Sequence, residues 1–178
     1  MSAEKSDQGL RGISAGATSI ATVGSEGKSL RYRGYDVTEL AEYAGFEEVA
    51  YLLLYGELPD ESELQSYQSS LRAQRSLPAP LYDVLERIPA DAHPMDVLRT
   101  GCSMLGTLEP ERDFSQQLDV ANRLIASFPS MLLYWHHFAT SGKRIATESD
   151  ETGIAGHFLR LLHGRKPEEL HERALDAS

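Results

Sequence analysis

Six histidines are the side chains of this sequence best suited to bind a metal ion or to move a proton. His136 and His137 are adjacent, and neighbours on a helix point about 100° apart, so these two cannot chelate one ion together. His157 and His163 are six residues apart and face nearly opposite sides of one predicted helix. No pair has the i, i+4 spacing of the zinc-binding HExxH motif. The spacing therefore favours packing or hydrogen-bonding roles for the histidines and predicts no metal site.

A small basic patch is predicted near the end of a helix, where Ser70, Arg72 and Arg75 lie close in sequence. Positive charge is favourable there because the carboxyl end of a helix carries partial negative charge. These side chains are candidates to contact an anionic ligand, although a solvated helix end is the simpler interpretation. Arg31 and Arg33 allow the same two interpretations.

The composition indicates a globular chain and disfavours nucleic acid and lipid as partners. The 178 residues carry 17 basic and 27 acidic side chains, so the formal net charge of −10 repels phosphate and anionic lipid. The longest apolar run, residues 49–55, is far shorter than the roughly 18 residues of a membrane span. The single cysteine, Cys102, cannot form an internal disulfide and is interpreted as a small core side chain. These features predict a cytoplasmic protein that neither enters a membrane nor binds nucleic acid.

The pattern of apolar residues predicts an all-α protein with one small β-hairpin near its start. Residues 1–11 are interpreted as a flexible arm, and residues 12–178 as one helical unit. Two short β-prone runs around a glycine-bearing turn predict the hairpin within residues 19–33. Asp36 and Asp60 each lie three residues before a glutamate, which resembles a helix capping box. Helices are expected after Asp36 and Asp60, over 46–55 and 81–88, from Pro94, from Ser115, over 154–163 and from Pro167.

Three of these helices carry signals of how they pack. The segment 46–55 is almost wholly apolar, so we expect it to be deeply buried. Pro129 removes a backbone hydrogen bond and predicts a bend near Ser127. Gly101 and Gly106 lower helix propensity but allow another backbone to approach closely. The helix that carries these glycines is therefore predicted to form one member of a tightly packed helix pair.

Several segments resemble the N-terminal half of the citrate synthases, in the same order and at similar intervals. These segments are LRYRGYD at 30–36, FEEVAYLLLYG at 46–56, Leu58-Pro59 and HPMD at 93–96. Others are similar to the 2-methylcitrate synthase branch of that family, namely RTGCSMLG at 99–106, LLYW at 132–135 and GHFLRLLHG at 156–164. The resemblance covers nearly everything after Gly9 and implies a multi-helix portion of the family's large domain, incomplete at its C-terminus.

The resemblance implies chemistry for which this chain lacks the catalytic groups. Members of the family condense an acyl-CoA with oxaloacetate: a carboxylate removes an α-proton, one histidine stabilises the enol, and another polarises the ketone. Those groups lie in the second half of the family's chain, and none of the six histidines here matches their positions. We therefore expect no catalytic residue in this chain and no permanently bound cofactor. The CoA thioester and oxaloacetate are expected as substrates of the complete enzyme only.

The resemblance also implies a homodimer formed by antiparallel helices. In the family, the helix after Pro94 and the long helix from Ser115 pack against their symmetry mates, so the same surface meets itself across a two-fold axis. The residues expected at this interface come from both helices and are His93, Pro94, Val97, Leu98, Gly101, Cys102, Leu105, Ile125 and Leu132.

Two functions from other classes stay open on the sequence. A helical dimerisation or interaction module would keep the self-pairing surface without chemistry, and a natural product of 19.7 kDa would favour it. A small metal-dependent hydrolase would use the histidines, and stoichiometric zinc would favour that function.

Overall fold

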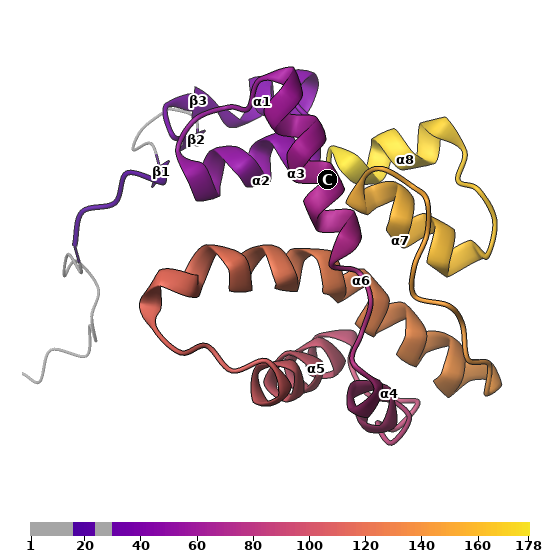
Figure 1. The fold of residues 1–178 in the computed structure, drawn as a ribbon. Coiled ribbons are helices and arrows are strands. Elements are labelled where there is room, and N and C mark those ends of the chain that lie inside the picture. The colour runs from indigo at the N-terminus through magenta and orange to yellow at the C-terminus, as the bar shows by residue number, and fades with distance from the viewer. Residues whose placement is uncertain (1–15, 24–29) are drawn as a thin grey trace, which may run out of the picture.

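A long central helix divides the structure, which is a computed structural model describing residues 16–23 and 30–178 (Figure 1). The expected arm over 1–11 lies outside the described residues. The elements are strands β1 (Ala21–Thr22), β2 (Arg31–Tyr32) and β3 (Tyr35–Asp36), helices α1 (Val37–Tyr43), α2 (Phe46–Tyr55), α3 (Glu61–Ala73), α4 (Ala79–Leu85), α5 (Pro94–Leu108), α6 (Gln117–Ser141), α7 (Ile154–His163) and α8 (Glu169–Asp176), and a 3-10 turn at Phe114–Gln116. The predicted all-α class with a small β element is confirmed.

Polar caps start three of the helices where the sequence predicts. Asp60 forms the full capping box of α3, because its carboxylate accepts from the Glu63 amide while the Glu63 carboxylate accepts from the Asp60 amide. The Asp36 carboxylate accepts from the Thr38 amide at the start of α1. At α5, His93 is the N-cap and Pro94 occupies the first helical position.

The starts of two other helices differ from the prediction. Ser115 is not the N-cap of the long helix, because Asp113 caps a 3-10 turn that precedes α6 and accepts hydrogen bonds from the Ser115 amide and hydroxyl. A carboxylate two residues earlier thus takes the role expected of Ser115. Pro167 is not in the first turn of α8 either, since that helix has Glu168 as its N-cap.

The predicted hairpin is a three-stranded antiparallel sheet in the order β1-β2-β3. The glycine-bearing turn between β1 and β2 falls on residues 24–29, outside the described part of the chain. The tight turn between β2 and β3 uses Arg33 and Gly34, whose φ angles of 49° and 97° lie in the left-handed region. The energetic cost of the left-handed conformation at Arg33 is offset by its guanidinium, which donates to the Ser19 hydroxyl and to the Leu53 carbonyl near the end of α2, each at 2.9 Å.

Helix α2 has the predicted bounds but not the predicted burial. Leu52 is fully enclosed, whereas the rings of Phe46 and Tyr55 are about two-fifths exposed. The expectation of deep burial was wrong, because most side chains of α2 are half-buried and the residues at its two ends are exposed.

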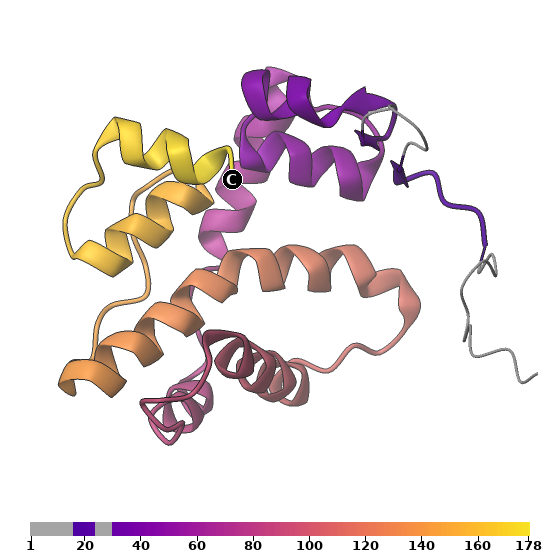
Figure 2. The same cartoon turned by 180° about the vertical axis from the view of Figure 1, so that it is seen from behind.

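The core lies on both faces of α6, which contacts α3, α4, α5 and α7 (Figures 1 and 2). One face packs with α4 and α5 around the enclosed side chains of Leu81, Leu85, Val97 and Met131. The other face carries Ala126, which packs with Tyr67 and Leu71 of α3. The ribbon of α6 runs through Pro129 and changes direction along its length, as the proline predicts.

The predicted tight helix pair is α5 against α6 within one chain. A methyl group added at Gly101 would lie 2.9 Å from Sδ of the fully buried Met131, whereas one added at Gly106 would meet no atom within 4 Å. The small residue is therefore needed at Gly101 and not at Gly106.

The pair Gly101→Ala and Gly106→Ala should change stability in opposite directions. Alanine at Gly106 lowers the backbone entropy of the unfolded chain and should therefore stabilise the fold by about 0.5 kcal/mol. Alanine at Gly101 should destabilise it by about 1 kcal/mol, because overpacking against Met131 exceeds that gain. Urea unfolding followed by circular dichroism measures both, and equal stabilisation by the two variants would contradict the close α5–α6 contact.

Candidate functional site

Arg75 lies inside the structure and not in a surface patch. Its side chain is 1% exposed, in the segment that links α3 to α4. The guanidinium donates to four backbone carbonyls of the loop before α7, those of Ser149 (3.2 Å), Glu151 (2.6 Å), Thr152 (3.1 Å) and Gly153 (3.1 Å). Burial lowers the pKa of Arg75 to about 10, which still leaves it charged at neutral pH. The prediction that Arg75 contacts a dissolved anion was wrong, because these carbonyls occupy the guanidinium.

Ser70 and Arg72 are exposed but do not share one site. Arg72 lines a hollow of about 480 Å³ together with Glu148 and Asp150, whose carboxylates disfavour an anion there. The Ser70 hydroxyl accepts from the Gln74 amide at 3.2 Å and lines a different hollow. The structure thus separates the three residues of the predicted patch.

Glu47 joins Arg75 in a buried polar cluster that the sequence analysis missed. Its carboxylate is 4% exposed and accepts from the Ile154 amide at 2.6 Å, so a side chain of α2 caps the N-terminus of α7. Burial raises the pKa of Glu47, and the charge of Asp176 adds to this rise, while the Ile154 amide and Arg75 oppose it. A carboxylate within the apolar segment 46–55 was the signal that could have identified this role.

His157 completes the buried polar cluster and is fully enclosed. The Ser130 hydroxyl donates its one hydrogen to the Thr147 carbonyl at 2.9 Å, so it must accept from Nε2 of His157 at 3.2 Å. Nδ1 is then the acceptor for the Ser149 hydroxyl at 2.9 Å. Burial lowers the pKa of His157 to about 3, helped by the positive charge of Arg75. The ring is a neutral structural group, as the spacing of the histidines predicts.

Replacing Arg75 by lysine should destabilise the fold by about 2–4 kcal/mol, because a compact ammonium cannot reach the carbonyls that the planar guanidinium bridges. Arg72→Lys, three residues earlier and exposed, is the matched control and should change stability by less than about 0.5 kcal/mol. Chemical denaturation of both variants provides the measurement. Similar small losses in the two would show that the carbonyl contacts of Arg75 add little.

Glu47 should make stability fall as pH rises from 4.5 toward neutrality. Folding raises the pKa of this carboxyl above its ordinary value of 4.5. The stabilisation that it contributes is therefore complete below pH 4.5 and is lost as the pH rises through the pKa of the folded state. Glu47→Gln keeps an acceptor for the Ile154 amide but cannot titrate. The stability of the parent chain relative to Glu47→Gln should therefore decline over this pH range, as measured by urea unfolding at several pH values. A pH-independent difference for Glu47→Gln would refute the assignment.

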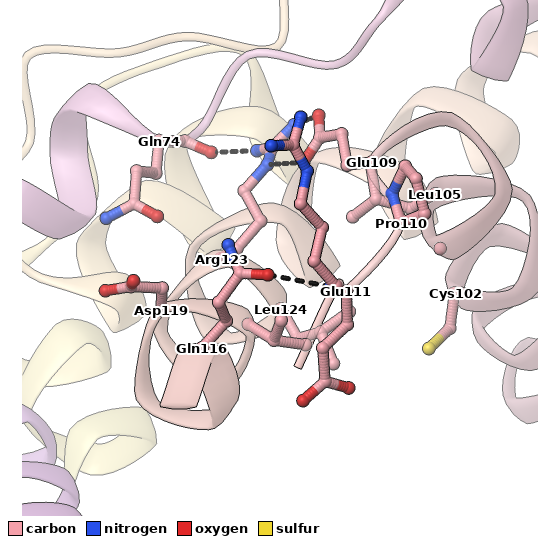
Figure 3. Close-up of a pocket in the computed structure, with 13 residues that line it drawn as sticks. Gln74, Cys102, Leu105, Glu109, Pro110, Glu111, Gln116, Asp119, Arg123 and Leu124 are labelled. Carbon is pink, nitrogen blue, oxygen red and sulfur yellow. Dashed lines mark hydrogen bonds and ion pairs between the residues drawn. The ribbon is translucent and has the colours of Figure 1, made fainter. Parts of the chain in front are cut away.

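A separate cavity of about 510 Å³ lies between the end of α5 and the first half of α6 (Figure 3). Arg123 in its wall is paired with the Glu109 carboxylate at 2.9 and 3.0 Å and also donates to the Gln74 carbonyl. Cys102 lies apart from this ion pair, and the lining contains no histidine to act as its base. Besides the paired Arg123, the lining holds apolar side chains such as Leu105 and Leu124 and the charged residues Glu111, Arg112 and Asp119.

The residues expected at a dimer interface fall into two groups. Val97, Gly101 and Leu105 are buried inside the chain, so their assignment to an interface was wrong: they face the α4–α6 side of α5. His93 and Pro94 are exposed, and the others, Leu98, Cys102, Ile125 and Leu132, are half-buried.

Among the described residues, no group of three or more His, Cys, Asp or Glu side chains could hold a metal ion. None of the described helices combines the length and the apolar character required to span a bilayer.

Residues 9–178 match the family model described as citrate synthase, C-terminal domain. The chain is 59% identical over 170 residues to a 2-methylcitrate synthase of Shewanella oneidensis, covering 96% of this chain and 45% of that protein. It is 39% identical over 167 residues to 2-methylcitrate synthase 1 of Corynebacterium glutamicum, covering 92% and 44% of the two chains. The fold is similar to that of citrate synthase from Thermotoga maritima, with a TM-score of 0.82, 30% identity and coverage of 96% and 44%. The chain spans less than half the length of these relatives.

Proposed function

Since the chain belongs to the citrate synthase family, we propose that it forms part of a 2-methylcitrate synthase, an acyltransferase that makes a carbon–carbon bond. The observation that carries this proposal is the 59% identity to a 2-methylcitrate synthase across almost the whole chain. The substrates of the complete enzyme are a CoA thioester, propionyl or acetyl, and oxaloacetate. The chain works in the cytoplasm and needs no permanently bound cofactor.

These 178 residues form a structural framework of the enzyme and include no catalytic residue. The buried polar cluster supports this assignment, because His157 is neutral and enclosed and the Arg75 guanidinium is occupied by backbone carbonyls. Proton abstraction from an acyl-CoA needs a base that can reach a substrate in a cavity. The cavity of Figure 3 contains Arg123 paired with Glu109 and the carboxylates of Glu111 and Asp119, but its described lining contains no histidine to stabilise an enol or polarise a ketone. The groups that carry out the reaction are assigned to sequence beyond these 178 residues.

The chain pairs with a second copy through the outer surfaces of α5 and α6. The proposal rests on the surface residues of the expected set, His93, Pro94, Leu98 and Cys102, together with Met95, which is 64% exposed in the first turn of α5. Pro94, Met95 and the half-buried Leu98 lie within five residues of α5, and apolar side chains gathered in one surface patch are typical of a contact surface.

A chimera in which this chain replaces the matching region of the Shewanella enzyme should release free CoA from propionyl-CoA and oxaloacetate. The 178-residue chain alone should give no rate above the blank, because it lacks a catalytic base. A thiol-detecting assay measures both, with the unmodified Shewanella enzyme as the control. A well-folded chimera without turnover would contradict the proposed function, and turnover by the chain alone would contradict the framework role.

A further inference from the structure

Three tyrosine rings line a hollow of about 360 Å³ between α2 and α3, which we call the tyrosine hollow. Tyr51 and Tyr55 come from α2, Tyr67 comes from α3, and Asn122 of α6 closes the inner end. Its other lining residues are Ser62, Glu63, Ser66 and Ser70. This hollow is lined by different residues from the cavity of Figure 3 and contains none of the buried polar cluster.

The rings of the tyrosine hollow are held in fixed positions. Tyr51 and Tyr55 stack with centroids 4.4 Å apart, and Tyr67 meets them edge-on at 5.4 and 6.0 Å. The Tyr67 hydroxyl donates to Oδ1 of Asn122 at 3.0 Å, and Nδ2 of Asn122 donates to the Tyr55 hydroxyl at 2.8 Å. Tyr67 and Asn122 are more than nine-tenths buried, whereas Tyr55 is 42% exposed. A rigid aromatic wall therefore reaches from the interior to the surface.

The electrostatic field at the tyrosine hollow is negative. Glu63 is the charged residue of the lining, and no lysine or arginine belongs to it. Burial raises the pKa of the Tyr51 hydroxyl, and the charges of Glu63, Glu57 and Asp60 raise it further. Tyr51 and Tyr55 cover one face of each other, so the faces turned away from that contact add the negative side of their quadrupoles to these carboxylates. Such a surface attracts cations and repels anions.

We propose that the tyrosine hollow binds a small organic cation of the quaternary ammonium or guanidinium class. Aromatic faces attract such cations because their charge is spread over an apolar surface that loses water readily. The carboxylate of Glu63 neutralises the charge, and the serine hydroxyls of α3 can accept hydrogen bonds from a guanidinium. An inorganic cation would need several oxygen ligands instead.

Titration of the full chain with choline, followed by the NMR shifts of the tyrosine rings, tests the proposal. Choline should shift the Tyr51 and Tyr55 signals in a saturable way, and its neutral carbon isostere should not. Glu63→Gln should weaken binding about tenfold, because it removes the charge but keeps the acceptor that caps α3. Glu61→Gln changes the same charge on an exposed residue of the same helical turn outside the lining, so it should bind as the parent does.

A second pair of variants separates the aromatic face from the hydroxyl. Tyr51→Phe should retain choline binding, and Tyr51→Leu should abolish it, with circular dichroism showing that both keep the parent's helix content. The proposal is overturned if the neutral isostere binds as tightly as choline, if Glu61→Gln weakens binding as much as Glu63→Gln, or if the tyrosine signals do not saturate.

Discussion

The burial of the Arg75 guanidinium constrains the packing of half the chain. A buried charge costs free energy unless polar groups surround it, and four backbone carbonyls of the loop before α7 accept from the two terminal nitrogens of Arg75, while Nε has no hydrogen-bond partner among the described residues. This contact fixes the loop against the segment between α3 and α4. The fixed loop places the Ile154 amide against Glu47 and the Ser149 hydroxyl against His157. Helices α2, α3, α6 and α7 are thus joined through one set of buried polar contacts.

Helix α6 is the second element on which the packing depends, because it has a core on each face. Met131 packs toward α4 and α5, and Ala126 packs toward α3. The same helix supplies Ser130 to the buried polar cluster and Asn122 to the tyrosine hollow. A change in the direction of α6 would therefore alter both regions. Because Pro129 lies within α6, the bend associated with it affects the position of both regions and not only the helix itself.

The polar residues of the chain divide into enclosed and accessible groups, and this division bears on function. His157 and Arg75 have the residue types of catalytic groups, yet their partners are backbone carbonyls and hydroxyls inside the fold. Arg123 is paired with Glu109 in the wall of the cavity of Figure 3. The tyrosine hollow differs because Tyr55 and Glu63 in its lining are exposed at the surface. A framework role for the enclosed groups and ligand binding at the hollow are compatible, because they use separate residues.

Signals local to the chain determined the helix bounds that could be predicted. Asp60 with Glu63, His93 with Pro94, and Gly56 and Gly164 at helix ends act on atoms within a few residues, so their effects can be read from the sequence. The resemblance to the citrate synthases likewise followed from short ordered segments. Tertiary structure alone decided that Arg75 is buried, that Gly101 faces Met131 of its own chain, and that Phe46 and Tyr55 at the ends of α2 are exposed. The first two depend on partners 30 residues away or more, Ser149 for Arg75 and Met131 for Gly101, and residue type does not specify which distant surface a side chain will meet.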